Sequence, residues 1–131
     1  MGLRPGLSHT LEIVVDRKDT AAHVGSGVVQ VLATPVVINL FESAALHAIE
    51  HLLPAGYQSL GTRLDVRHIA ATPVGMKVSA SARVARVEGR TVYFALEAHD
   101  ERELIADGAH ERVIVNVAKF DARVQKKLAG G

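Results

Sequence analysis

The chain of 131 residues has the length of a single domain (1–131), and a hydrophobic content of 48% is enough to form one core. Fifteen basic and fourteen acidic residues nearly cancel and aromatic residues are only 4% of the chain, so we expect no nucleic acid partner. The absence of cysteine excludes disulfides and thiol nucleophiles. No apolar run has membrane-spanning length and no signal peptide is recognisable, so we expect a soluble, cytoplasmic protein without a membrane partner.

The first half of the chain contains one strand pattern, one loop pattern and one long helix pattern. Residues 9–15 alternate loosely and predict a strand, whereas residues 20–26, with glycines at 25 and 27, predict a loop that serves as a flexible lid. Residues 31–54 carry apolar side chains at helical spacing around most of the circumference, which indicates a mostly buried helix. Thr34 and Pro35 are expected to be its N-cap and first helical residue.

After the helix the apolar period changes from 3.6 to 2 and stays there. This alternation predicts four strands joined mostly by tight turns, at residues 60–70, 78–84, 92–98 and 104–117, followed by a short amphipathic turn in the tail. One strand, a long helix and four strands make an α+β fold in which a five-stranded antiparallel sheet buries its apolar face on the helix. The open edges of such a sheet favour a homodimer or a higher homo-oligomer.

Three polar residues stand where a core is expected. Glu42 lies at the edge of the apolar arc of the helix, where it is either a boundary residue reaching solvent or a buried carboxylate suited to act as a base. His68 lies in the apolar phase of its strand, as a core histidine or as a catalyst. Thr34 is either a simple N-cap or a hydroxyl beside the positive end of the helix dipole, where an oxyanion is stabilised. A strand wrapped over the helix is expected to bring His68 within hydrogen-bond reach of Glu42.

The other histidines are weaker candidates. The H-x-x-E-H pattern at residues 47–51 matches a zinc signature, but it lies on the polar side of the helix and no third ligand suggests itself, so we predict no metal site. His99 and His110 are expected to be ordinary surface or edge residues. Arg112 either forms an ion pair or contacts the phosphates of a ligand.

Several short motifs occur in a characteristic order: the helix start at 34–42, SLGT at 59–62, HIAATPVG at 68–75, VEGR at 87–90, AHD at 98–100 and HER at 110–112. Together they resemble the hotdog-fold acyl-CoA thioesterases, in the branch typified by fluoroacetyl-CoA thioesterase, over residues 31–120. The resemblance implies a hotdog fold, with a sheet wrapped around one central helix. It also implies a dimer whose two sheets join and whose acyl pockets lie at the interface.

The resemblance further implies a catalytic group of Thr34, Glu42 and His68, with Gly61 and Arg112 binding the substrate. The predicted activity is hydrolysis of an acyl-CoA thioester to free acid and CoA, without a cofactor or a metal. The alternatives are a noncatalytic protein that binds acyl-CoA or another small ligand on the same dimeric fold and, as a weaker enzyme alternative, a dehydratase. The fluoroacetyl branch is expected to close its pocket with aromatic residues, and residues 20–33 contain none, so we expect another short or medium acyl group.

Overall fold

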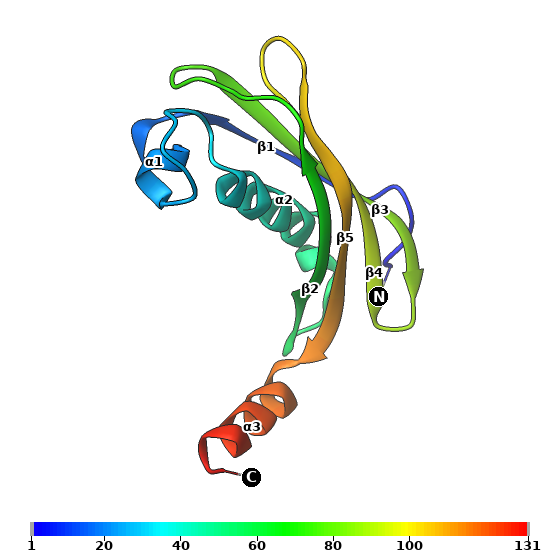
Figure 1. Cartoon of the computed structure of the whole chain (residues 1–131). Helices are drawn as coiled ribbons and strands as arrows, with labels where there is room; N and C mark the ends of the chain where they lie inside the picture. Colours follow the sequence, from blue (N-terminus) through cyan, green and yellow to red (C-terminus); the bar gives the residue numbers. More distant parts are fainter. Residues whose placement is uncertain (1, 131) are drawn as a thin grey trace.

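A five-stranded antiparallel sheet curls around one long helix in this computed structural model, which describes residues 2–130 (Figure 1). The strand order is β1-β3-β4-β5-β2, so β1 and β2 form the two edges. The strands are β1 (Ser8–Val14), β2 (Tyr57–His68), β3 (Lys77–Glu88), β4 (Thr91–His99) and β5 (Leu104–Asn116). The predicted α+β arrangement with five antiparallel strands is confirmed, and each predicted strand is present with slightly shifted ends.

The long helix α2 (Thr34–Ile49) lies on the concave face of the sheet, mainly against β1 and β3, and ends in a 3₁₀ turn (Glu50–Leu52). Its buried face consists of small and aliphatic residues with one aromatic: Val37, Phe41, Ala44, Ala45, Ala48 and Ile49. The facing strand β3 also buries small side chains, among them Ala80 and Ala82. Because three alanines of the helix meet alanines of the sheet, the helix backbone can approach the strands closely.

The predicted cap of α2 is wrong by one residue. Ala33 is the N-cap, Thr34 is the first helical residue, and no side chain caps this end. The reason is that the Ala33 carbonyl already accepts hydrogen bonds from the N–H groups of Val36 and Val37, at 3.1 and 3.2 Å. The Thr34 hydroxyl is therefore not needed as a cap.

The segment between β1 and α2 is more ordered than the predicted loop. It contains a 3₁₀ turn (Arg17–Asp19) and the one-turn helix α1 (Ala21–Val24), which ends at Gly25 in the left-handed region, φ +83°. A bridge between Thr20 and Leu32 closes the segment on itself, and the Ala21 N–H donates to the Val31 carbonyl at 2.9 Å. This closure places α1 beside the start of α2 (Figure 1).

The tail is longer than the predicted short turn. Helix α3 (Val117–Leu128) begins directly after β5, where the Asn116 side chain accepts a hydrogen bond from the Lys119 N–H at 3.1 Å. Lys126 and Lys127 lie in its last turn, where cations interact favourably with the helix dipole. The helix points away from the sheet and buries none of its residues (Figure 1).

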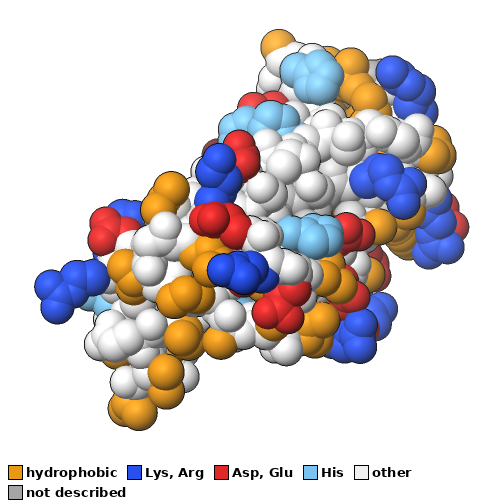
Figure 2. Space-filling model, turned by 90° about the horizontal axis from the view of Figure 1, so that it is seen from above, with side chains coloured by type: hydrophobic (Ala, Val, Ile, Leu, Met, Phe, Trp, Pro, Cys, Tyr) orange, Lys and Arg blue, Asp and Glu red, His pale blue; other side chains and the backbone are white. Residues whose placement is uncertain are grey.

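Charges of both signs are mixed on the surface. On the face that Figure 2 shows, basic side chains lie among acidic ones. Two ion pairs join β2 to β5: Arg67 lies 3.0 Å from Asp107, and Arg63 lies 3.5 Å from Glu111. No helix in the described residues is long and apolar enough to cross a membrane.

Gly108 of β5 provides a test of the β2–β5 pairing. A Cβ at this position would overlap the carbonyl oxygen of Asp65 and lie 2.9 Å from the Cα of Val66, both backbone atoms of β2. We expect Gly108→Ala to lower the free energy of unfolding by about 1–3 kcal/mol, because backbone cannot move aside cheaply. Urea denaturation measures this, with Gly27→Ala as control, since its added Cβ meets only an ordinary contact at 3.4 Å. Equal stability of the two variants would contradict the strand register.

Candidate active site

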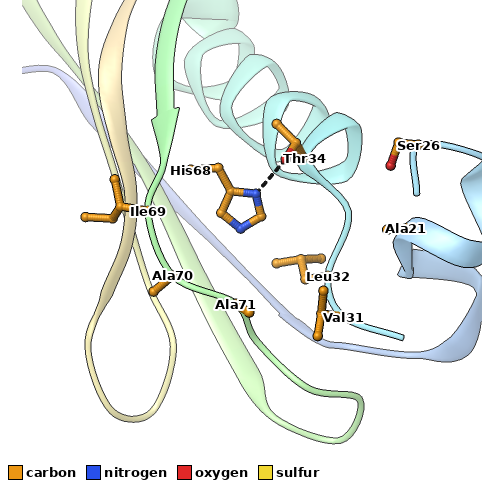
Figure 3. Close-up of a pocket in the computed structure, with 9 residues that line it drawn as sticks. All are labelled: Ala21, Ser26, Val31, Leu32, Thr34, His68, Ile69, Ala70 and Ala71. Atoms are coloured by element: carbon orange, nitrogen blue, oxygen red, sulfur yellow. Dashed lines mark hydrogen bonds between the residues drawn. The ribbon is translucent and has the colours of Figure 1, made fainter. Parts of the chain in front are cut away.

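A hydrogen bond joins the start of α2 to the end of β2. Thr34 Oγ1 lies 2.7 Å from His68 Nδ1 (Figure 3). Thr34 is the first residue of α2 and His68 the last residue of β2, so the two side chains meet where the sheet curls over the amino end of the helix. Two of the three predicted catalytic residues therefore lie together in one chain.

The Thr34–His68 pair opens into a cavity of about 300 Å³. Aliphatic side chains of Val31 and Leu32 and the small residues 70 and 71 form much of its wall, whereas the side chain of Ile69 points away from the His68 ring (Figure 3). Ala21 and Ser26 contribute from the segment between β1 and α2, here called the α1 segment. Among the described residues no Phe, Tyr or Trp lines it. The cavity thus combines an apolar wall with one hydroxyl–imidazole pair, which is the usual character of a small-molecule site.

His68 is suited to accept a proton. Burial lowers the pKa of His68, because it disfavours the charged imidazolium, while the Ala70 backbone partly opposes this shift. A neutral ring whose Nδ1 carries the lone pair can accept the Thr34 proton. In that tautomer Nε2 carries the hydrogen, and the buried Nε2 has no hydrogen-bond partner among the described residues. The ring therefore has Nδ1 engaged with Thr34, while Nε2 is buried on the side of the Ala70 backbone.

The same helix end offers a backbone donor. The N–H groups of Ala33, Val36 and Val37 are engaged with backbone carbonyls, and Pro35 has none. The Thr34 N–H has no partner among the described residues. A free N–H at the positive end of a helix dipole can stabilise an oxyanion next to the Thr34 hydroxyl.

The remaining predicted residues, Glu42, Gly61 and Arg112, lie together with His110 in a second group, here called the Glu42 cluster. Arg112 Nη1 lies 3.6 Å from Glu42 Oε2. A Cβ on Gly61 would lie 2.6 Å from the same Glu42 oxygen and 3.1 Å from His110 Cε1. Only a glycine at position 61 therefore leaves room for the carboxylate in this position.

His110 is the residue that the sequence interpretation missed. It was expected at the surface or an edge, and this expectation is wrong, because His110 is 1% exposed and faces the core from β5. β5 is an inner strand of the sheet, between β4 and β2. The signal was present, since His110, Arg112 and the buried Ile114 share one phase of the alternation.

The expected hydrogen bond between Glu42 and His68 is not formed within the described chain. Nδ1 of His68 bonds Thr34, its Nε2 has no partner, and the Glu42 carboxylate pairs with Arg112. Eight residues separate Thr34 from Glu42 on α2, which corresponds to roughly 12 Å along the helix axis. The three predicted catalytic residues thus fall into two centres, the Thr34–His68 pair and the Glu42 cluster.

The H-x-x-E-H pattern does not gather ligands. His47 Nδ1 bonds the Ser43 carbonyl at 2.7 Å, and the His47 ring stacks on that of His9 with centroids 5.2 Å apart. Across the described residues no three side chains of the metal-binding types cluster.

Comparison with known proteins identifies relatives of this chain among thioesterases. The model of a family described as fluoroacetyl-CoA-specific thioesterase matches residues 15–118. A fluoroacetyl-CoA thioesterase from Streptantibioticus cattleyicolor is 35% identical over 136 residues, covering 99% of this chain and 98% of that protein. A solved structure of a fluoroacetyl-CoA thioesterase has a TM-score of 0.90 at 35% identity, over 97% of this chain and 98% of the other.

A hot-dog-like protein from Thermanaerovibrio acidaminovorans has a TM-score of 0.87 at 27% identity, over 94% of this chain and 91% of the other. Together with the curled sheet around α2, this similarity confirms the predicted hotdog fold. The matches in sequence and structure agree, and the chain belongs to the fluoroacetyl-CoA-specific thioesterase family.

Proposed function

We propose that this member of the thioesterase family hydrolyses the thioester of a short or medium acyl-CoA, using the Thr34–His68 pair. The observation that carries the proposal is the 2.7 Å hydrogen bond between Thr34 Oγ1 and His68 Nδ1 at the edge of an apolar cavity. The relatives support the reaction class, because the similar protein from Streptantibioticus cattleyicolor is a fluoroacetyl-CoA thioesterase. The acyl chain would lie against Val31 and Leu32.

In the proposed reaction His68 Nδ1 accepts a proton as an oxygen attacks the thioester carbonyl carbon. The carbonyl oxygen becomes an oxyanion near the Thr34 N–H at the start of α2. The C–S bond then breaks, and the imidazolium returns the proton to the leaving CoA thiolate. The net reaction consumes one water and gives a carboxylic acid and free CoA. The same hydrogen bond serves a direct attack by Thr34 and an attack by a water that Thr34 orients.

We propose that the protein acts as a homodimer and that Glu42 reaches the thioester from a second copy. β2 is an edge strand of 12 residues, and its outer side pairs with no strand of the described chain. A free edge of this length favours pairing with another chain. The Glu42 side chain, 41% exposed, is compatible with a site completed across such an interface.

The hydroxyl of Thr34 provides the most direct test. Thr34→Val keeps the shape but removes the proton that His68 accepts, so we expect kcat to fall at least roughly 100-fold, as for the loss of a general base. Thr34→Ser, which keeps the hydroxyl, should retain most of the activity. Release of the CoA thiol from a series of acyl-CoAs measures this. Turnover by Thr34→Val equal to the wild type would remove the mechanism, and tight acyl-CoA binding without any release of CoA would favour the noncatalytic alternative.

Subunit complementation tests the shared site. His68→Ala and Glu42→Gln should each be nearly inactive alone. If His68 and Glu42 act across two copies, a mixed dimer of these variants contains one intact site, so co-expression should restore about a quarter of the wild-type activity by random pairing. A site within one chain predicts no restoration. The matched control is the double variant, with His68→Ala and Glu42→Gln in one chain, mixed with wild type. It shows whether the subunits exchange.

The pH dependence follows from the burial of His68. Only the neutral ring accepts a proton, and burial lowers the pKa of His68, so the neutral form persists to lower pH than in a free imidazole. We therefore expect the acid limb of kcat/KM to have its midpoint below about 6.5, the ordinary value for histidine. Initial rates between pH 4.5 and 8 measure this. A midpoint above that value would contradict a buried histidine base.

A further inference from the structure

The strongest unassigned feature is the buried side chain of His110. It is 1% exposed, and the nearest aromatic ring, that of Phe94 on β4, lies 5.8 Å away between centroids. Both ring nitrogens are engaged: Nδ1 lies 2.8 Å from the Arg63 carbonyl oxygen and Nε2 lies 3.2 Å from Arg112 Nη1. The reaction described above makes no use of this ring.

The two partners fix one protonation state of His110. A carbonyl oxygen only accepts hydrogen bonds, so Nδ1 must carry a hydrogen. A guanidinium only donates, so Nε2 must carry the lone pair. The arrangement therefore requires a neutral imidazole with its hydrogen on Nδ1. A protonated ring would set an N–H and a positive charge directly against Arg112.

His110 in turn restricts the Arg112 guanidinium, which is 5% exposed. Nε donates to the Ser59 hydroxyl at 2.9 Å, Nη2 donates to the Ser59 carbonyl at 3.0 Å, and Nη1 donates to His110. Ser59 thus holds one side of the planar group and His110 holds the corner that faces Glu42. Nη1 is the atom that also lies 3.6 Å from the Glu42 carboxylate.

The charged groups around His110 come from three elements. Arg112 and Glu111 lie on β5 with His110, and Glu42 comes from α2. The Arg63 guanidinium of β2 lies 3.5 Å from the Glu111 carboxylate. Burial lowers the pKa of His110 and the Arg112 charge lowers it further, while the Arg63 carbonyl, Glu42 and Glu111 oppose the shift. The direction agrees with the neutral state that the hydrogen bonds require.

We propose that His110 is a positioning residue for thioester hydrolysis: its neutral ring holds the Arg112 guanidinium against Glu42, and protonation of the ring releases that contact. The effect of this contact on the rate of hydrolysis rests on the proposed function, in which Glu42 acts on the thioester. The contact itself rests only on the geometry of His110, Arg112 and Ser59. An Arg112 without the acceptor at its Nη1 is free to turn away from Glu42.

Two substitutions at His110 distinguish the effect of losing the hydrogen-bond acceptor from the effect of losing the volume of the ring. His110→Gln places a neutral amide oxygen where Nε2 accepts from Arg112, whereas His110→Leu fills similar space without an acceptor. We expect kcat at pH 8 to fall tenfold or more in His110→Leu and to stay within about threefold of wild type in His110→Gln. His99→Leu, at an exposed histidine of β4, is the control with unchanged kcat. Thermal unfolding of all variants identifies any that fail to fold.

A spectroscopic measurement tests the contact without relying on activity. With ¹⁵N-labelled histidine, the His110 ring should show the tautomer protonated at Nδ1 and should resist protonation to lower pH than a free imidazole. Arg112→Met should raise the pH at which His110 protonates. An Nε2-protonated ring, or equal loss of kcat in the Gln and Leu variants, would overturn the proposal. A chain that shows the expected tautomer but hydrolyses no thioester would instead overturn the proposed function and leave the His110–Arg112 contact standing.

Discussion

Close packing of α2 against the sheet determines where every polar group of the site lies. Ala44 and Ala45 are fully buried on the helix, and Ala80 and Ala82 are fully buried on β3, so small side chains form much of this contact beside the larger Phe41 and Ile49 of the helix. With the helix fixed in this way, its amino end reaches the last residue of β2, and its third turn brings Glu42 to Arg112 of β5. The Thr34–His68 pair and the Glu42 cluster are consequences of this single docking. Larger residues on this face would force off-rotamer side chains and backbone shifts.

A buried guanidinium is costly unless its donors are satisfied, and the surroundings of Arg112 meet that demand mostly with neutral groups. Ser59 supplies two oxygens and His110 one nitrogen, while Glu42 supplies a charge from a partly exposed position. A carboxylate that is 41% exposed keeps part of its hydration. The arrangement therefore leaves Glu42 accessible from the helix side, with Arg112 holding it from the sheet side.

Periodicity was sufficient to predict the helix, the five strands and their antiparallel sheet. All of these depend on which face of each element is apolar. It was not sufficient to place Glu42 against His68. Alternation gives the face of an element on which a side chain lies. Which residues of the helix and the strand stand opposite one another depends on how far the two elements are shifted along each other, and only the structure gives that shift. The same limit explains the cap: a threonine before a proline predicts capping, whereas the Ala33 carbonyl made it unnecessary. His110 was within reach of the sequence, since it alternates in phase with Arg112 and Ile114.

The walls of the cavity determine what kind of selectivity the site can have. Besides Thr34 and His68, the side chains around it are aliphatic or small, apart from the hydroxyl of Ser26. Such a wall separates acyl groups by size, and each methylene that fits or fails to fit changes binding by about 1–3 kcal/mol. Its width depends on the α1 segment, which the Thr20–Leu32 bridge closes on itself and the Val31–Pro73 bridge joins to the turn before β3. In the proposed reaction, acyl length would be governed by how this closed segment sits over Thr34, and the hydroxyl–imidazole pair would govern only the chemistry at the carbonyl.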